Sequence, residues 1–112
     1  MIKSIREYVD EKGDSPFAQW FEGLDAAVAA KVATSLYRME QGNFSRVKGV
    51  GSGIFECKID FGPGYRIYFG KDGEELVILL GGGSKKRQAV DIEAAMSCWK
   101  DYKRRKRTEQ LQ

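Results

Sequence analysis

The residues with the clearest chemical potential are cations and a phenol in one short stretch of the chain. Lys58, Arg66 and Tyr68 stand in two segments where apolar and polar residues alternate, as they do in strands with one buried face. This alternation predicts that all three side chains lie on the polar face of a sheet, away from the core. Ammonium, guanidinium and phenol groups on an open sheet face suit a phosphodiester better than a small apolar ligand.

A glycine-rich segment should bring further cations to the same edge of the sheet. Gly81-Gly82-Gly83-Ser84 follows an apolar strand and precedes Lys85, Lys86 and a helix. Its backbone N–H groups, together with the two lysines, could hold a phosphate. The alternative is a flexible turn followed by a solvated helical turn. Cations at a helix N-terminus oppose the helix dipole, however, so the pattern favours a function over stability alone.

The chain has no histidine, which removes the side chain best suited to acid–base catalysis near neutral pH. Its acidic residues are not grouped as metal ligands are. Glu74 and Glu75 follow a turn and should face opposite sides, and Lys58 separates Glu56 from Asp60. We therefore expect any nuclease activity to use Lys, Arg and Tyr, with no metal and no cofactor.

Two turn signals predict the register of the expected sheet. Gly62-Pro63-Gly64 is a three-residue hairpin loop with glycine available for a positive φ, and Asp72-Gly73 is a strong two-residue hairpin signal. The predicted pairs are Phe61 with Tyr65, Asp60 with Arg66, Lys58 with Tyr68, and Phe69 with Leu76. Residues 76–80 are apolar on both faces, which is typical of a central strand.

The remaining elements complete the order β-α-α-β-β-β-α. Ser15 and Pro16 predict the start of a short helix, and Asp25 should cap a second helix that ends near Gly42. Residues 1–9 form the first strand, residues 44–50 a connector with some extended structure, and the last helix carries Ile92, Ala95, Trp99 and Tyr102 on one stripe.

Length and composition indicate one domain with its own core. The 112 residues are 42% hydrophobic. No apolar run reaches the roughly 20 residues of a membrane span and no signal peptide is visible, so we expect a cytoplasmic protein without membrane contact. Cys57 and Cys98 lack metal-ligand spacing and should be reduced thiols, with Cys57 on the core face.

Charge divides the chain unevenly. Residues 1–84 carry a net charge of −2 and residues 85–112 a net charge of +5, much of it in residues 103–107. A basic tail of this kind indicates either nucleic-acid binding or a solvated helix end whose cations favour the C-terminal dipole, and the tail alone does not decide between them. We expect a single domain over residues 1–103 and a flexible basic tail over residues 104–112.

Several of these segments together resemble the HigB/RelE-like, addiction-module killer branch of the RelE/ParE-type toxins. The resemblance rests on Gly53–Phe69, the apolar strand after it, Lys85-Lys86-Arg87-Gln88-x-x-Asp91-Ile92 and the segment Trp99–Lys103, and it covers nearly the whole chain. It implies an α+β fold, a small twisted and mainly antiparallel four-stranded sheet with the helices packed on one face. It also implies an antitoxin partner, expected to be of the helix-turn-helix type, and in many members cleavage of mRNA on the ribosome.

On this resemblance, the chain is expected to be a toxin that cleaves mRNA as a metal-independent endoribonuclease. The ribose 2′-hydroxyl would attack the adjacent phosphate and expel the 5′-oxygen. Arg66 would clamp the phosphate, unless it forms a cross-strand ion pair with Asp60. Tyr68 would relay a proton or stack on a base, unless it packs against Val77. The catalytic candidates are Lys58, Arg66, Tyr68, Lys85 and Lys86, and the RNA-binding candidates are Lys48, Arg87, Gln88, Arg104 and Arg105.

The three lysines among the catalytic candidates would stabilise charge, and one of them is the candidate base. Cys57-Lys58 stands where relatives commonly carry Leu-Arg, and lysine keeps the positive charge but loses bidentate recognition of phosphate. Two alternatives stay open. One is a ParE-like toxin that inhibits DNA gyrase without cleaving RNA, and the other is a non-catalytic RNA-binding module that uses the same cations.

Overall fold

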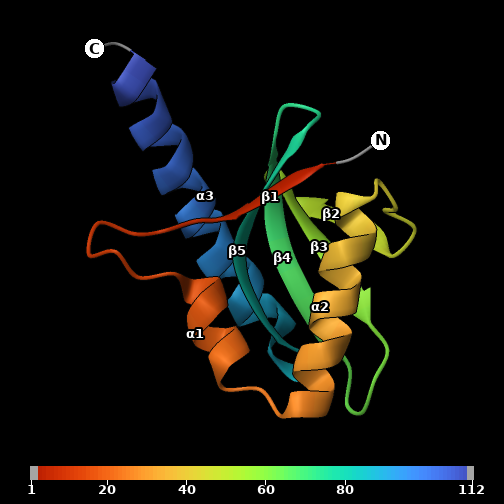
Figure 1. Ribbon diagram of the computed structural model, residues 1–112. Coiled ribbons are helices and arrows are strands. Elements are labelled where there is room, and N and C mark those ends of the chain that lie inside the picture. Colours follow the sequence, from red (N-terminus) through yellow and green to blue (C-terminus); the bar gives the residue numbers. More distant parts are fainter. Residues whose placement is uncertain (1–2, 111–112) are drawn as a thin grey trace.

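The computed structural model describes residues 3–110, which form one five-stranded sheet with helices on both of its faces (Figure 1). The strands are β1 (Ser4–Glu7), β2 (Val47–Gly51), β3 (Ile54–Ile59), β4 (Tyr65–Asp72) and β5 (Leu76–Ser84). The helices are α1 (Pro16–Glu22), α2 (Ala26–Glu40), the short 3-10 turn η1 (Lys85–Arg87) and α3 (Gln88–Gln110). The strand order is β1-β5-β4-β3-β2, with β1 parallel to β5 and the other neighbouring pairs antiparallel. The expected α+β class is confirmed.

The sheet of the described chain has five strands, not the four expected. The segment expected to be a connector contains strand β2, which pairs with β3 and has an irregular register between Gly49 and Gly51. Glycines interrupt the alternation of its sequence, which weakens the strand signal. Strand β1 is shorter than expected, and residues 1–2 of the expected strand lie outside the described residues.

Each face of the sheet has its own hydrophobic core. Helices α1 and α2 cover one face, where Phe17 packs in a cluster with Phe69 of β4. Helix α3 covers the other face, where Trp99 belongs to a cluster that includes Tyr68. The expectation that the helices pack on one face is therefore wrong. The physical reason lies in β5, whose residues 77–80 are all buried because both faces of this strand are covered.

The first hairpin keeps the predicted faces but not the predicted pairs. Lys58 lies opposite Arg66, and Ile59 lies opposite Tyr65, so residues 60–64 connect the strands instead of three residues. This register differs from the predicted one by two residues. Because side chains alternate with a period of two, Lys58 and Arg66 still share one face.

The second hairpin differs from the prediction in a more consequential way. The observed pairs are Asp72 with Leu76 and Phe69 with Leu79. Between the turn and an irregularity at Tyr68 and Phe69, the register is shifted by three residues. Because this number is odd, the side chains of residues 76–79 exchange faces relative to the prediction. Asp72 stays within β4, where its carboxylate accepts a 2.6 Å hydrogen bond from the Tyr102 hydroxyl. This bond ties the end of the hairpin to α3, a tertiary contact that the turn signal does not contain.

Local helix signals were largely reliable. Pro16 opens α1, and the Ser15 hydroxyl accepts a 3.0 Å hydrogen bond from the backbone N–H of Ala18, as an N-cap does. Asp25 occupies the N-cap position of α2, but its side chain makes no capping hydrogen bond. No helix within residues 3–110 combines the length and the apolar character needed to cross a membrane.

Helix α3 carries the predicted apolar stripe. Ala95 and Trp99 are buried in the second core, and Ile92 and Tyr102 pack against it. The helix continues through the basic segment to Gln110, and its C-terminal end projects beyond the sheet (Figure 1). A domain boundary at residue 103 and a flexible tail after it stay predictions.

Candidate anion-binding site

Three of the predicted catalytic cations surround one pocket. The pocket has a volume of about 350 Å³ and is lined by Lys58, Asp60, Phe61, Gly62-Pro63-Gly64, Arg66 and Lys85. Lys58 and Arg66 are directly opposed on β3 and β4. Lys85 is brought to them by a 3.0 Å hydrogen bond from its backbone N–H to the carbonyl of Gly64. The pocket therefore joins the β3–β4 turn to the turn that precedes α3.

Arg66 is not on an open surface, contrary to the sequence-based expectation. It is only 6% exposed and lies beside Glu56, which is 1% exposed. The Arg66 Nε atom is 3.4 Å from Glu56 Oε2, an ion-pair distance without the alignment of a hydrogen bond. Its Nη1 donates a 3.2 Å hydrogen bond to the Tyr65 carbonyl. The expected alternative partner, Asp60, instead pairs with Arg46 at 2.6 Å and with Lys58 at 3.5 Å.

Glu56 is the residue that sequence reasoning missed. Besides Arg66, its carboxylate receives a 3.3 Å hydrogen bond from the Gln88 side chain and lies 3.4 Å from Lys48 Nζ. It thus joins β2, β4 and the start of α3. Its place between cations on the polar face of the expected sheet was a usable signal, because diagonal neighbours on adjacent strands lie within reach of long side chains.

Tyr68 is the clearest correction among the candidate residues. Its side chain is fully buried, and its hydroxyl has no hydrogen-bond partner. Burial, with the nearby carboxylates of Glu56 and Asp91, raises its pKa to about 12. Tyr68 belongs to the core beneath α3, whereas Val77, its expected packing partner, belongs to the core on the opposite face. Tyr68 therefore does not reach the pocket.

The other candidates near the start of α3 have separate surroundings. Lys86 is exposed and does not line the pocket. Arg87 Nε lies 3.7 Å from Asp91 Oδ1, within one helical turn. Burial raises the pKa of the Asp91 carboxyl, and the Arg87 charge opposes that shift. The Gln88 side chain donates its hydrogen bond to Glu56, and its expected contact with RNA stays a prediction.

Arg104 and Arg105 lie at the other end of α3, about 24 Å along the helix axis from Gln88. Arg105 Nε donates a 2.9 Å hydrogen bond to Asp101, and Arg104 lies 3.5 Å from a carboxylate oxygen of Glu11. These contacts place both guanidinium groups among carboxylates. The structure therefore does not bring them together with the candidate catalytic cations.

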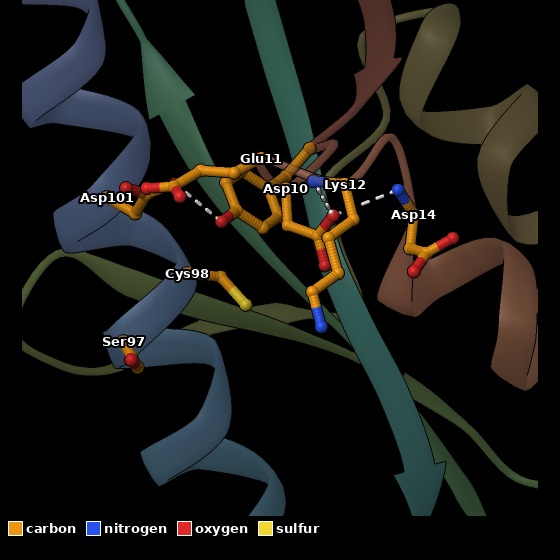
Figure 2. A pocket seen from close by; sticks show the side chains of 8 residues that line it. Asp10, Glu11, Lys12, Asp14, Ser97, Cys98 and Asp101 are labelled. Atoms are coloured by element: carbon orange, nitrogen blue, oxygen red, sulfur yellow. Dashed lines mark hydrogen bonds between the residues drawn. The ribbon is translucent and has the colours of Figure 1, made fainter.

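Figure 2 shows a second pocket, which lies beside the middle of α3. Its volume is about 480 Å³. Its carboxylates are largely occupied by local contacts. Asp10 Oδ1 accepts hydrogen bonds of 2.9 Å from the backbone N–H groups of Lys12 and Asp14. The Tyr8 hydroxyl donates a 2.6 Å hydrogen bond to Asp101, and burial together with the proximity of Asp101 raises the pKa of this phenol to about 12. The Asp10 contacts shape the loop after β1, and the hydrogen bond from Tyr8 to Asp101 ties the start of this segment to α3.

The two cysteines are free thiols in the structure, as expected. Cys57 is buried on the core face, and burial raises its pKa to about 11. Across residues 3–110, no three Cys, Asp or Glu side chains gather as a metal site would require.

Residues 19–99 match the family model of the phage derived protein Gp49-like family (DUF891). The chain belongs to this family, which is associated with toxin–antitoxin addiction modules and implies an antitoxin partner. An uncharacterized protein of Haemophilus influenzae is 42% identical over 80 residues, which are 70% of this chain and 81% of the relative. The match includes the pocket residues Lys58, Arg66 and Lys85, whereas Arg104 and Arg105 lie outside the matched range.

Proposed function

We propose that the chain is the toxin of a toxin–antitoxin module and that it cleaves mRNA as an endoribonuclease of the RelE/ParE type. The observation that carries this proposal is the convergence of Lys58, Arg66 and Lys85 on one pocket of about 350 Å³. A site with three cations and a glycine-bounded turn suits a phosphate group and the extra negative charge of a pentacoordinate phosphorane.

The proposed reaction is an internal transesterification. The ribose 2′-oxygen forms a bond to the adjacent phosphorus, and the bond from phosphorus to the 5′-oxygen breaks. Arg66 clamps the phosphoryl oxygens, and Lys58 and Lys85 approach from the two neighbouring elements. One lysine accepts the 2′-hydroxyl proton, while the other donates a proton to the leaving 5′-oxygen. The products are a 2′,3′-cyclic phosphate and a 5′-hydroxyl.

We propose an assignment of roles in this reaction that differs from the sequence-based expectation. Tyr68 takes no direct part, because its side chain is fully buried beneath α3. Lys86, Lys48 and Arg87 are exposed near the start of α3 or on β2 and are proposed to contact RNA beyond the reacting phosphate. The proposed setting is mRNA on the ribosome, and the proposed antitoxin is a helix-turn-helix protein that silences the toxin.

Purified protein incubated with RNA, free and on ribosomes, tests the proposal. We expect cleavage to persist in excess chelator and to leave 2′,3′-cyclic or 3′-phosphate ends. Lys58→Ala should lower the rate by about 100-fold, the effect of removing one group that stabilises the transition state. Lys100→Ala is the matched control, since Lys100 is an exposed lysine of α3 outside the pocket. A 3′-hydroxyl product, or activity that requires a divalent ion on intact ribosomes, would refute the mechanism.

A further inference from the structure

Glu56 is the carboxylate with the least solvent exposure among the described residues, and it lies directly behind the proposed phosphate clamp. A buried carboxylate is costly unless cations and hydrogen-bond donors compensate it. Glu56 has three such partners from three separate elements: Arg66 on β4, Lys48 on β2 and Gln88 at the start of α3. Two of them meet the same oxygen, Oε2, at 3.4 Å and 3.3 Å.

This geometry divides the Arg66 guanidinium into two sides. Its Nε edge faces Glu56, and its Nη1 donates to the Tyr65 carbonyl. The same side chain lines the pocket with Lys58 and Lys85. These contacts on one side of the guanidinium keep its remaining N–H donors oriented toward the pocket. A guanidinium that is already oriented loses less conformational entropy when it binds a phosphate.

We infer that Glu56 is a positioning residue, which orients Arg66 toward the phosphate and couples that orientation to the start of α3 through Gln88. This inference rests on the proposed function. It assigns a role to Glu56, which does not itself line the pocket. The proposed role distinguishes Glu56 from Asp60. Asp60 is a carboxylate that lines the pocket but contacts Lys58 and Arg46 instead of Arg66.

The two carboxylates allow a charge-matched comparison of Glu56→Gln with Asp60→Asn. Each change removes one negative charge near the pocket and keeps the shape of the side chain. Asp60→Asn should lower KM, because the pocket becomes more positive while Arg66 keeps its anchor. Glu56→Gln should lower kcat by about tenfold to 100-fold with KM changed less than about twofold, because Arg66 loses its fixed orientation. Far-UV circular dichroism and urea unfolding establish that both variants are folded.

A double-mutant cycle with Arg66→Lys tests the same point. In the Arg66→Lys variant, adding Glu56→Gln should lower kcat by less than about twofold, because both substitutions remove the same interaction between Glu56 and the guanidinium. Full additivity of the two losses, or a lower KM with unchanged kcat in Glu56→Gln, would overturn the positioning role.

Binding of a 2′-O-methyl oligoribonucleotide, which lacks the attacking hydroxyl, separates this inference from the proposed function. The inference expects Asp60→Asn to bind this RNA more tightly than wild type and Glu56→Gln to bind it no more tightly. Equal tightening in the two variants overturns the inference even when wild type cleaves RNA. Absence of cleavage by wild type overturns the proposed function, and the binding comparison still decides the role of Glu56. A wild type that neither binds nor cleaves RNA overturns both.

Discussion

Glycine 70 allows α3 to approach the sheet, and replacing it gives a direct test of the second core. A Cβ placed on Gly70 would lie 2.6 Å from Cε3 of Trp99, which is too close for two carbon atoms. The indole would have to withdraw by about 1 Å to reach ordinary contact distance. Gly81 is a suitable control, since it lies opposite Tyr68 on the same sheet and a Cβ there would meet nothing within 4 Å.

The expected effects of these two substitutions have opposite signs. Overpacking costs about 1–3 kcal/mol, and replacing glycine by alanine within a strand returns about 0.5–1 kcal/mol. We therefore expect Gly70→Ala to lower the free energy of unfolding by roughly 1–2 kcal/mol and Gly81→Ala to raise it by about 0.5 kcal/mol. Urea unfolding monitored by circular dichroism measures both, and the difference corresponds to several degrees in Tm. Equal stability of the two variants would refute the packing of α3 against this face.

Three further predictions concern the site and its surroundings. Lys58→Arg should keep RNA binding but lower kcat for RNA cleavage by about 100-fold, because the guanidinium keeps the positive charge but does not exchange a proton near neutral pH, and an unchanged kcat would contradict the proton transfer proposed for Lys58. Arg66→Ala should lower the free energy of unfolding by at least about 2 kcal/mol in urea titrations, because it leaves Glu56 buried with fewer partners, and unchanged stability would contradict the buried pair. Hydrogen bonds from Lys106 and Tyr102 hold the pKa of Asp72 below its ordinary value of 3.8. The stabilisation from ionised Asp72 is thus complete above pH 3.8 and is lost as pH falls through the lowered pKa. The difference in free energy of unfolding between wild type and Asp72→Asn should therefore narrow from about pH 7 to about pH 3, and a difference that stays constant would contradict the lowered pKa.

Side-chain alternation was sufficient to place Lys58 and Arg66 on one face of the sheet. That result survives the error in register, because the first hairpin is shifted by an even number of residues. The second hairpin shows the limit of turn signals. Asp72 and Gly73 indicate a tight turn, but the strand continues through Asp72, whose carboxylate binds a residue 30 positions away in α3.

The exposure of the site could not be predicted from the same pattern. Alternation assigns a side chain to a face, and it does not say whether a helix covers that face. Tyr68 and Arg66 point to the same side of the sheet, yet α3 buries Tyr68 completely while Arg66 still lines a pocket. Two sequence features together indicated that a helix covers this face: the apolar stripe on α3 and the apolar residues on both faces of β5. Each needs an apolar surface to pack against, and the second core provides it.

Glu56 illustrates why a candidate site needs the structure. Its sequence neighbours suggested a surface position on a polar strand face, where an ion pair is worth little. The start of α3 removes it from solvent, and the same contact with Gln88 turns it into the support of a buried guanidinium. Such a role depends on a contact between β3 and α3, made by Glu56 and Gln88, which are 32 positions apart in the sequence.

Expression of the chain in cells from a tightly controlled promoter tests whether the pocket cleaves RNA. Mapping the 5′-ends of cellular messages, alongside the supercoiling of a reporter plasmid, distinguishes the nuclease from a gyrase inhibitor. We predict cleaved messages within minutes and unchanged supercoiling for wild type and Lys100→Ala, and intact messages for Lys58→Ala. Intact messages with altered supercoiling in cells that express wild type, or normal growth at full expression, would contradict the account.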